Sequence, residues 1–105
     1  MERKLEHFGI PMPAVPAGAN YAEGLKIWMT DPSTSANNLE LLHFEEGTPF
    51  PVEVCTIAHV AYSVESLDEA MAGKRLLFDK LDCGDYVIAF VEEEGIPVEY
   101  IEYKK

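Results

Sequence analysis

The fold is indicated by two stretches that resemble each other, LEHFGIP at residues 5–11 and IAHVAYSV at residues 57–64. Each places one histidine early in a short apolar run, next to a small residue and aliphatic ones. Successive side chains of a strand point to opposite faces, so His7 and His59 each share a face with the small residue two positions further on. Small neighbours leave room around an imidazole. We therefore predict two equivalent strands, each carrying a histidine on one face.

Two later strands each carry a glutamate between apolar residues. Glu40 lies in NLELLHF (38–44), and Glu99 lies in PVEYIEY (97–103). A buried carboxylate without a partner costs several kcal/mol, so each glutamate either faces water or has a partner. Taken singly, each histidine is explained by a backbone hydrogen bond and each glutamate by exposure to water. Their matched positions in two halves instead favour an internal duplication that supplies one shared site.

The remaining pattern predicts an α+β fold in a single domain, residues 1–105. A helix is predicted over 65–73, where Ser66 and Glu69 form a capping box. Proline and glycine make 11–24 a loop and 48–54 a connector between module one, about 1–47, and module two, about 55–105. Alternating or continuous apolar runs predict the strands, which are 5–10, 25–32, 39–46, 55–64, 75–81, 86–94 and 96–103.

Charge and composition exclude some partners. Nineteen acidic residues against eight basic ones give a net charge of −11, and the basic residues form no stripe alternating with aromatic ones. Such a field repels nucleic acid and anionic lipid surfaces, so we expect neither as a partner. No apolar run approaches the ~20 residues of a membrane span, and no leader pattern is present, so we expect a cytoplasmic protein. Cys55 and Cys83 fit no metal or redox motif.

The two histidines and two glutamates together predict a metal site formed by His7, Glu40, His59 and Glu99. Neutral imidazole and carboxylate suit divalent zinc, nickel, cobalt, manganese or iron, and no thiolate is needed. Strand aromatics are usually core residues, so we expect Trp28, His43, Tyr62, Tyr86, Phe90 and Tyr100 to be core rather than substrate wall.

The chain resembles the vicinal oxygen chelate superfamily, which includes glyoxalase I, methylmalonyl-CoA epimerase, fosfomycin resistance proteins and extradiol dioxygenases. The resemblance is carried by four stretches, which are EHFGI (6–10), NLELLHF (38–44), AHVAYSVESLDEAMA (58–72) and GDYVIAFVEEEGIPVEY (84–100). It implies two βαβββ modules that form a cupped mixed sheet around a divalent metal. By position, His7 and Glu40 would be ligands from module one, and His59 and Glu99 from module two. The first module departs from the pattern, because the proline-rich segment replaces its helix.

The resemblance implies a metal-dependent lyase or isomerase that acts on a small oxygen-rich molecule, such as a hydroxy-ketone or sugar derivative. The metal would stabilise an enediolate-like anion, and Glu40 or Glu99 would move the proton, with Glu99 slightly preferred. Two alternatives stay open. One is a sequestering protein of the bleomycin-resistance type, which needs no metal, and the other is an iron(II) dioxygenase, which needs only one carboxylate ligand.

The substrate and the assembly are less constrained. Glutathione and coenzyme A adducts carry several negative charges, yet Arg3 and Arg75 are the only arginines, and neither lies in a cluster. A glutathione-dependent lyase or a CoA epimerase is therefore not the preferred activity. A short cup with exposed sheet edges favours pairing of two copies, so we expect a homodimer.

Overall fold

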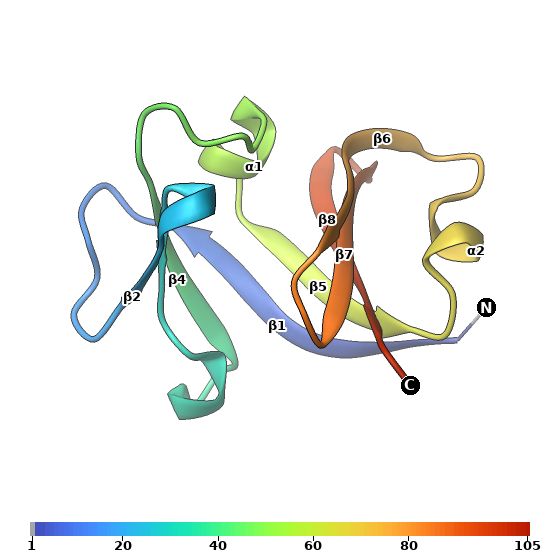
Figure 1. Cartoon of the computed structure of the whole chain (residues 1–105), viewed down its shortest axis with the longest axis horizontal. Coiled ribbons are helices and arrows are strands. Elements are labelled where there is room, and N and C mark those ends of the chain that lie inside the picture. Colours follow the sequence, from blue (N-terminus) through green and yellow to red (C-terminus); the bar gives the residue numbers. More distant parts are fainter. Residues whose placement is uncertain (1) are drawn as a thin grey trace.

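Eight strands form one mixed sheet that curls into a half-barrel in the computed structural model, which describes residues 2–105 (Figure 1). The order across the sheet is β2-β3-β4-β1-β5-β8-β7-β6. The strands are β1 (Arg3–Pro11), β2 (Asn20–Ala22), β3 (Ile27–Met29), β4 (Leu39–Phe44), β5 (His59–Val64), β6 (Arg75–Asp82), β7 (Tyr86–Glu93) and β8 (Ile96–Tyr103).

The two histidine strands, β1 and β5, lie side by side at the centre of the sheet. They pair antiparallel, with His7 opposite Ala61 and Gly9 opposite His59. Each also has a parallel neighbour, β4 beside β1 and β8 beside β5. In Figure 1 the short strands β2 to β4 lie on one side of this pair and β7 and β8 on the other. The arrangement therefore brings one glutamate strand next to each histidine strand.

Helices are few and short. The α-helix α2 (Leu67–Met71) begins after Ser66, whose hydroxyl accepts a hydrogen bond from the Glu69 amide, so the predicted N-cap at Ser66 is confirmed. A second α-helix, α1 (Val52–Thr56), begins after Pro51. Two 3₁₀ turns, η1 (Glu23–Leu25) and η2 (Pro32–Thr34), flank β3.

The sheet has a different core on each face. On one face α2 packs over β5, β7 and β8, and the buried residues there are Val64, Leu67, Ala70, Ala89, Val91, Val98 and Tyr100. On the other face lie Phe50, Val54, Ala61, Ile88, Phe90 and Ile101. Because side chains alternate along a strand, neighbours such as Glu99 and Tyr100 of β8 point to opposite faces. The second face is the concave one and contains the candidate site.

Several predicted boundaries are wrong. The connector over 48–54 and the start of the strand over 55–64 are replaced by α1, and β5 begins only at His59. Pro51 has the extended conformation of an N-cap, and Val54 is buried in the concave core, which stabilises this short helix. The predicted loop over 11–24 includes β2, which pairs with β3. Apolar contacts made across the sheet decide these segments, and a local pattern does not record such contacts.

Between β1 and β4 the described chain contains two short strands and the two 3₁₀ turns, with no α-helix. This agrees with the expectation that the first half has no helix, and the α+β class is confirmed. Within residues 2–105, no helix has the length and apolar character needed to cross a membrane.

Candidate metal centre

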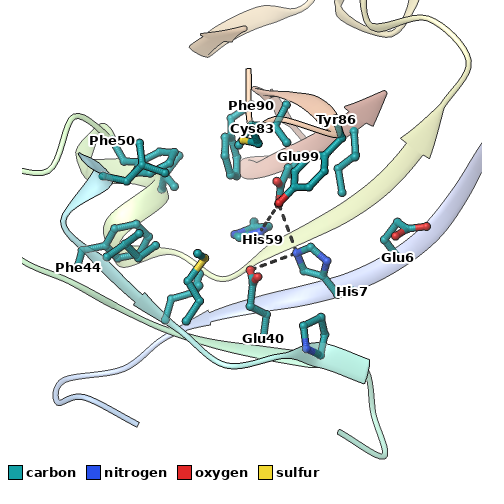
Figure 2. A pocket seen from close by; sticks show the side chains of 18 of the residues that line it. Glu6, His7, Glu40, Phe44, Phe50, His59, Cys83, Tyr86, Phe90 and Glu99 are labelled. Carbon is teal, nitrogen blue, oxygen red and sulfur yellow. Dashed lines mark hydrogen bonds and ion pairs between the residues drawn. The ribbon is translucent and has the colours of Figure 1, made fainter. Parts of the chain in front are cut away.

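Four side chains predicted from the sequence meet on the concave face of the sheet. His7 comes from β1, Glu40 from β4, His59 from β5 and Glu99 from β8. One ligand atom of each lies within 4.8 Å of the others. Figure 2 shows the four side chains pointing toward a common point, and we call them the histidine–glutamate cluster. The central strands of the sheet therefore bring together residues that are up to 92 positions apart in the chain.

Glu99 lies at the centre of the contacts. Its Oε1 is 3.0 Å from Nε2 of His59 and 3.3 Å from Nε2 of His7. Nε2 of His7 is also 3.3 Å from Oε1 of Glu40 (Figure 2). Both histidines and Glu99 are buried, and Glu40 is half-buried. The site is a buried group of nitrogen and oxygen donors that could bind a metal ion.

The spacing of these atoms fits a divalent ion. Zinc binds imidazole nitrogen and carboxylate oxygen at about 2.0–2.2 Å, which separates adjacent ligand atoms by roughly 2.8–3.1 Å at octahedral angles and roughly 3.3–3.6 Å at tetrahedral angles. The distances of 3.0 and 3.3 Å fall within these limits. Nε2 of His7 is buried and lies 3.3 Å from a carboxylate oxygen of both Glu40 and Glu99, although within residues 2–105 neither contact has the geometry of a hydrogen bond. An imidazole nitrogen that points between two carboxylates is an arrangement that suits a metal ligand.

The charges of the cluster also favour a cation. Burial alone would lower the pKa of His7, but the carboxylates of Glu40 and Glu99 outweigh burial and raise it to about 10. Burial would raise the pKa of Glu99, but its contacts with the imidazoles of His59 and His7 outweigh burial and hold it at about 2. Without a metal, a proton on His7 therefore supplies positive charge beside the Glu99 carboxylate. A metal ion that binds here displaces that proton.

The imidazole of His59 is held between β1 and β7. A Cβ placed on Gly9 would lie 2.0 Å from Cε1 of His59, so only glycine leaves room for the ring at this position. On another side, the Phe90 ring meets the imidazole edge to face, with centroids 5.0 Å apart. Nδ1 of His59 is buried without a hydrogen-bond partner. The ring of His59 is therefore oriented by its packing against Gly9 and Phe90 and not by a hydrogen bond to its Nδ1, and this packing directs its Nε2 toward the cluster.

The cluster opens into a cavity of about 250 Å³. Its wall is largely aliphatic and aromatic, with Phe44 and Phe50 on one side and Tyr86 on another (Figure 2). Phe50 and Val54 come from the segment predicted as a connector, and its pattern PFPV contains no recognisable binding motif. The aromatic residues predicted as core divide into two groups. Phe90 and Tyr86 line the cavity, whereas Trp28, His43, Tyr62 and Tyr100 are not among its lining residues.

Within the described chain, neither lysine nor arginine lines this cavity. Arg3 forms an ion pair with Glu93, with 3.0 Å between Nη1 and Oε1. Arg75 is paired with Glu53 at 3.3 Å. The acidic residues of the wall are Glu6, Glu40 and Glu99, and Glu6 accepts a hydrogen bond from Tyr103. The cavity therefore combines acidic metal-binding groups with an apolar wall and, within residues 2–105, has no lysine or arginine.

Comparison with known proteins gives a structural match only. No family model matches the chain, and no curated protein matches it. A crystal structure of a hypothetical protein from Bacillus halodurans C-125 is similar, with a TM-score of 0.71 and 18% sequence identity. The match covers 100% of this chain and 97% of that one. The similarity supports the half-barrel fold along the whole chain and carries no information on activity.

Proposed function

We propose that this protein is a metal-dependent lyase or isomerase of the glyoxalase type, built from two related modules and acting on a small hydroxy-ketone or similar oxygen-rich substrate. The observation that carries the proposal is the convergence of four donor atoms within 4.8 Å at the floor of a cavity. If all four side chains held a six-coordinate ion, two positions would remain for substrate oxygens. The parallel pairs β1–β4 and β5–β8 support a duplicated origin, because each provides one histidine and one glutamate.

In this proposal His7, His59, Glu99 and Glu40 hold the ion. When bound, a divalent ion provides Lewis-acid stabilisation of an enediolate-like anion. The surrounding residues make one side of the cavity apolar, because Phe90 packs against His59 and Phe44 packs against Phe50. An apolar wall strengthens electrostatic interactions beside it.

Glu40 is the better candidate for the proton-transferring base. Glu99 is held by contacts to both imidazoles, so its free lone pairs are fewer. Glu40 contacts His7 at 3.3 Å, and its side chain is 17% exposed against 9% for Glu99. A carboxylate that is less tightly held can accept a proton from a carbon next to the substrate carbonyl and return it to the neighbouring carbon. This refines the sequence-based preference for Glu99, which we assign to metal binding.

Deuterium exchange tests the proposal. The hydroxymethyl protons of 2-hydroxyacetophenone are followed by NMR in D₂O with protein, with or without added zinc, cobalt or manganese. We expect metal-loaded protein to accelerate exchange and Glu40→Gln to reduce the rate by about 10²–10⁴-fold. The metal content of Glu40→Gln is measured in parallel, because loss of a metal ligand would lower both the metal content and the exchange rate, whereas loss of the base would lower only the rate. Exchange that needs no metal, or is unchanged in Glu40→Gln, would contradict the proposal.

A sequestering protein is the second candidate, and the apolar wall of the cavity favours it. Such a protein binds its ligand without a metal and without turnover. Metal analysis of protein purified without added metal separates the two. We expect about one divalent ion per chain for the enzyme, whereas ligand binding that is equal with and without a chelator would support sequestration. Iron as the native ion, with oxygen-dependent turnover, would instead support the dioxygenase.

A further inference from the structure

The wall of the cavity restricts the chemistry of what can bind beyond the metal. Apart from the histidine–glutamate cluster, its side chains are mainly aliphatic and aromatic. The aromatic ones include Phe44, Phe50 and Phe90, with Phe50 only 5.9 Å from Phe90 between ring centroids. Leu25, Ile27 and Met29 continue the apolar surface. A hydroxyl-rich molecule such as a sugar would lose hydrogen bonds to water against this wall without replacing them.

The charge around the cavity works against anionic ligands. Three carboxylates line it, and within residues 2–105 no lysine or arginine does. Even with a divalent ion bound, the site keeps an excess of negative charge. The net charge of −11 extends this repulsion to the approach of the ligand. Arg3 and Arg75 are each paired elsewhere, so neither is available to hold a phosphate or carboxylate.

The volume of the cavity limits the size of the ligand. A benzene molecule fits a closed apolar cavity of about 150 Å³. The cavity here is about 250 Å³, which fits one ring together with a short chelating group. A conjugate with a tripeptide or a nucleotide handle would extend far outside, where no cationic group of the wall would hold it.

We propose that the ligand is a neutral molecule with one aromatic or similarly sized apolar ring attached to its two metal-binding oxygens, and that anionic conjugates are excluded. This inference rests on the proposed function for the metal-binding part of the ligand. The ring lies against the phenylalanine wall, and the oxygens face the histidine–glutamate cluster. Tyr86, which is 36% exposed and lines the same cavity, is the point at which a charge on the ring would meet protein.

Three hydroxamates with one chelating group test the inference. They are acetohydroxamate, benzohydroxamate and 4-carboxybenzohydroxamate, and their binding to cobalt-loaded protein is followed by the visible absorption of cobalt. We expect benzohydroxamate to bind at least about 10-fold more tightly than acetohydroxamate, because the ring leaves water. We expect 4-carboxybenzohydroxamate to bind at least about 10-fold more weakly than benzohydroxamate, because its charge is desolvated without a partner. Equal affinities, or tighter binding of the carboxylated compound, would overturn the inference.

A charge introduced at the cavity provides the matched variant. Tyr86→Arg should improve binding of 4-carboxybenzohydroxamate by about 10-fold, as expected for a charge-assisted contact. The control is Tyr21→Arg, because Tyr21 is similarly exposed and is not among the lining residues. If Tyr86→Arg fails to fold, Met29→Lys places a cation on the same wall. Equal improvement in variant and control would contradict the assignment of the ring to this cavity.

Metal-free protein separates failure of this inference from failure of the proposed function. Saturation-transfer NMR reports whether the ring protons of benzohydroxamate contact the protein without metal. Ring contact in a protein that binds no cobalt would support the apolar cavity and overturn the metal-dependent function. If the protein bound cobalt and the hydroxamates but did not prefer the compound with a ring, the metal-dependent function would be supported and the inference about the ring would be overturned.

Discussion

Two polar clusters lie on opposite faces of the same strands, and they differ in how their charges are matched. On the concave face, Glu99 belongs to the histidine–glutamate cluster. On the other face, the adjacent Tyr100 contacts Arg3, Lys74 and Glu93, which we call the arginine–lysine cluster. Neighbouring positions of β8 thus supply one residue to each cluster.

The arginine–lysine cluster is satisfied internally. The guanidinium of Arg3 and the ammonium of Lys74 each lie 3.0 Å from Glu93, and each also donates a hydrogen bond to the Tyr100 hydroxyl. Arg3 also lies over the Tyr62 ring, 4.3 Å from its centroid. The concave cluster instead has, within residues 2–105, two carboxylates without a lysine or arginine, and Nδ1 of His59 is buried without a hydrogen-bond partner. The comparison supports the proposal that the first cluster stabilises the fold and that the concave one binds a metal ion.

The largest expected difference between the two clusters is the effect on zinc affinity of removing the charge of Glu99. Replacement of a group that only supports a metal ligand costs about 10–100-fold in metal affinity, so Glu99→Gln, which alters a ligand, should cost more than ~100-fold. Glu93→Gln in the arginine–lysine cluster should leave the affinity unchanged. Isothermal titration with zinc measures both. Similar affinities for the two variants would remove the functional distinction between the clusters.

A methyl group on Gly9 should weaken metal binding without changing any ligand. In Gly9→Ala the new Cβ meets the imidazole of His59, so the ring and its Nε2 must move. We expect a loss of about 10–100-fold in zinc affinity, the size of an effect that acts through ligand orientation. Gly24→Ala is the matched control, because nothing lies within 4 Å of the Cβ it would add. An equal affinity in Gly9→Ala and Gly24→Ala would show that the packing of His59 does not position the ligand.

The arginine–lysine cluster should affect stability instead. Glu93→Gln removes the negative charge shared by Arg3 and Lys74, and we expect a loss of roughly 1–2 kcal/mol, since the cations are partly open to water. Urea unfolding of metal-free protein at pH 7 measures the change in the free energy of unfolding. Glu45→Gln, at the pair of Tyr21 and Trp28, provides a second exposed carboxylate for comparison. No loss in Glu93→Gln would mean that the cluster is not a stabilising element.

The smallest expected effect is the pH dependence of that difference. Burial would raise the pKa of Glu93, but hydrogen bonds from Tyr100, Lys74 and Arg3 outweigh it and lower the pKa from 4.5 to about 2. Folding therefore favours the ionised form, and this stabilisation is complete above pH 4.5 and is lost as the pH falls toward 2. The stability gap between wild type and Glu93→Gln should narrow between pH 7 and pH 3.5. A gap that stays constant or widens would contradict this sign.

The sequence predicted the four residues of the histidine–glutamate cluster better than it predicted the cavity beside them. His7, Glu40, His59 and Glu99 were recognisable because histidines and glutamates interrupt apolar strands in both halves, and such residues need a partner. The β7–β8 hairpin and the cap of α2 followed from turn and capping chemistry close to each residue. These features depend on neighbours in the chain.

Other features depend on contacts between distant segments. α1 is stabilised by burial of Val54 in the concave core, and the two prolines that precede it, Pro49 and Pro51, suggested a connector. Gly9 appeared merely small, whereas its lack of a Cβ makes room for an imidazole 50 residues away. Glu93 lies at the centre of three consecutive glutamates, a local pattern that does not indicate a partner, yet it binds both Arg3 and Lys74. Strand order, which the local pattern does not contain, decides each of these.

The central claim is that four side chains from two halves of the chain hold one divalent ion. Anomalous diffraction at the zinc absorption edge, from crystals grown with zinc, locates the ion without reference to activity. We predict a single strong peak among Nε2 of His7, Nε2 of His59 and the carboxylates of Glu40 and Glu99. A peak bound elsewhere, or no peak at this point when zinc is present, would contradict the account.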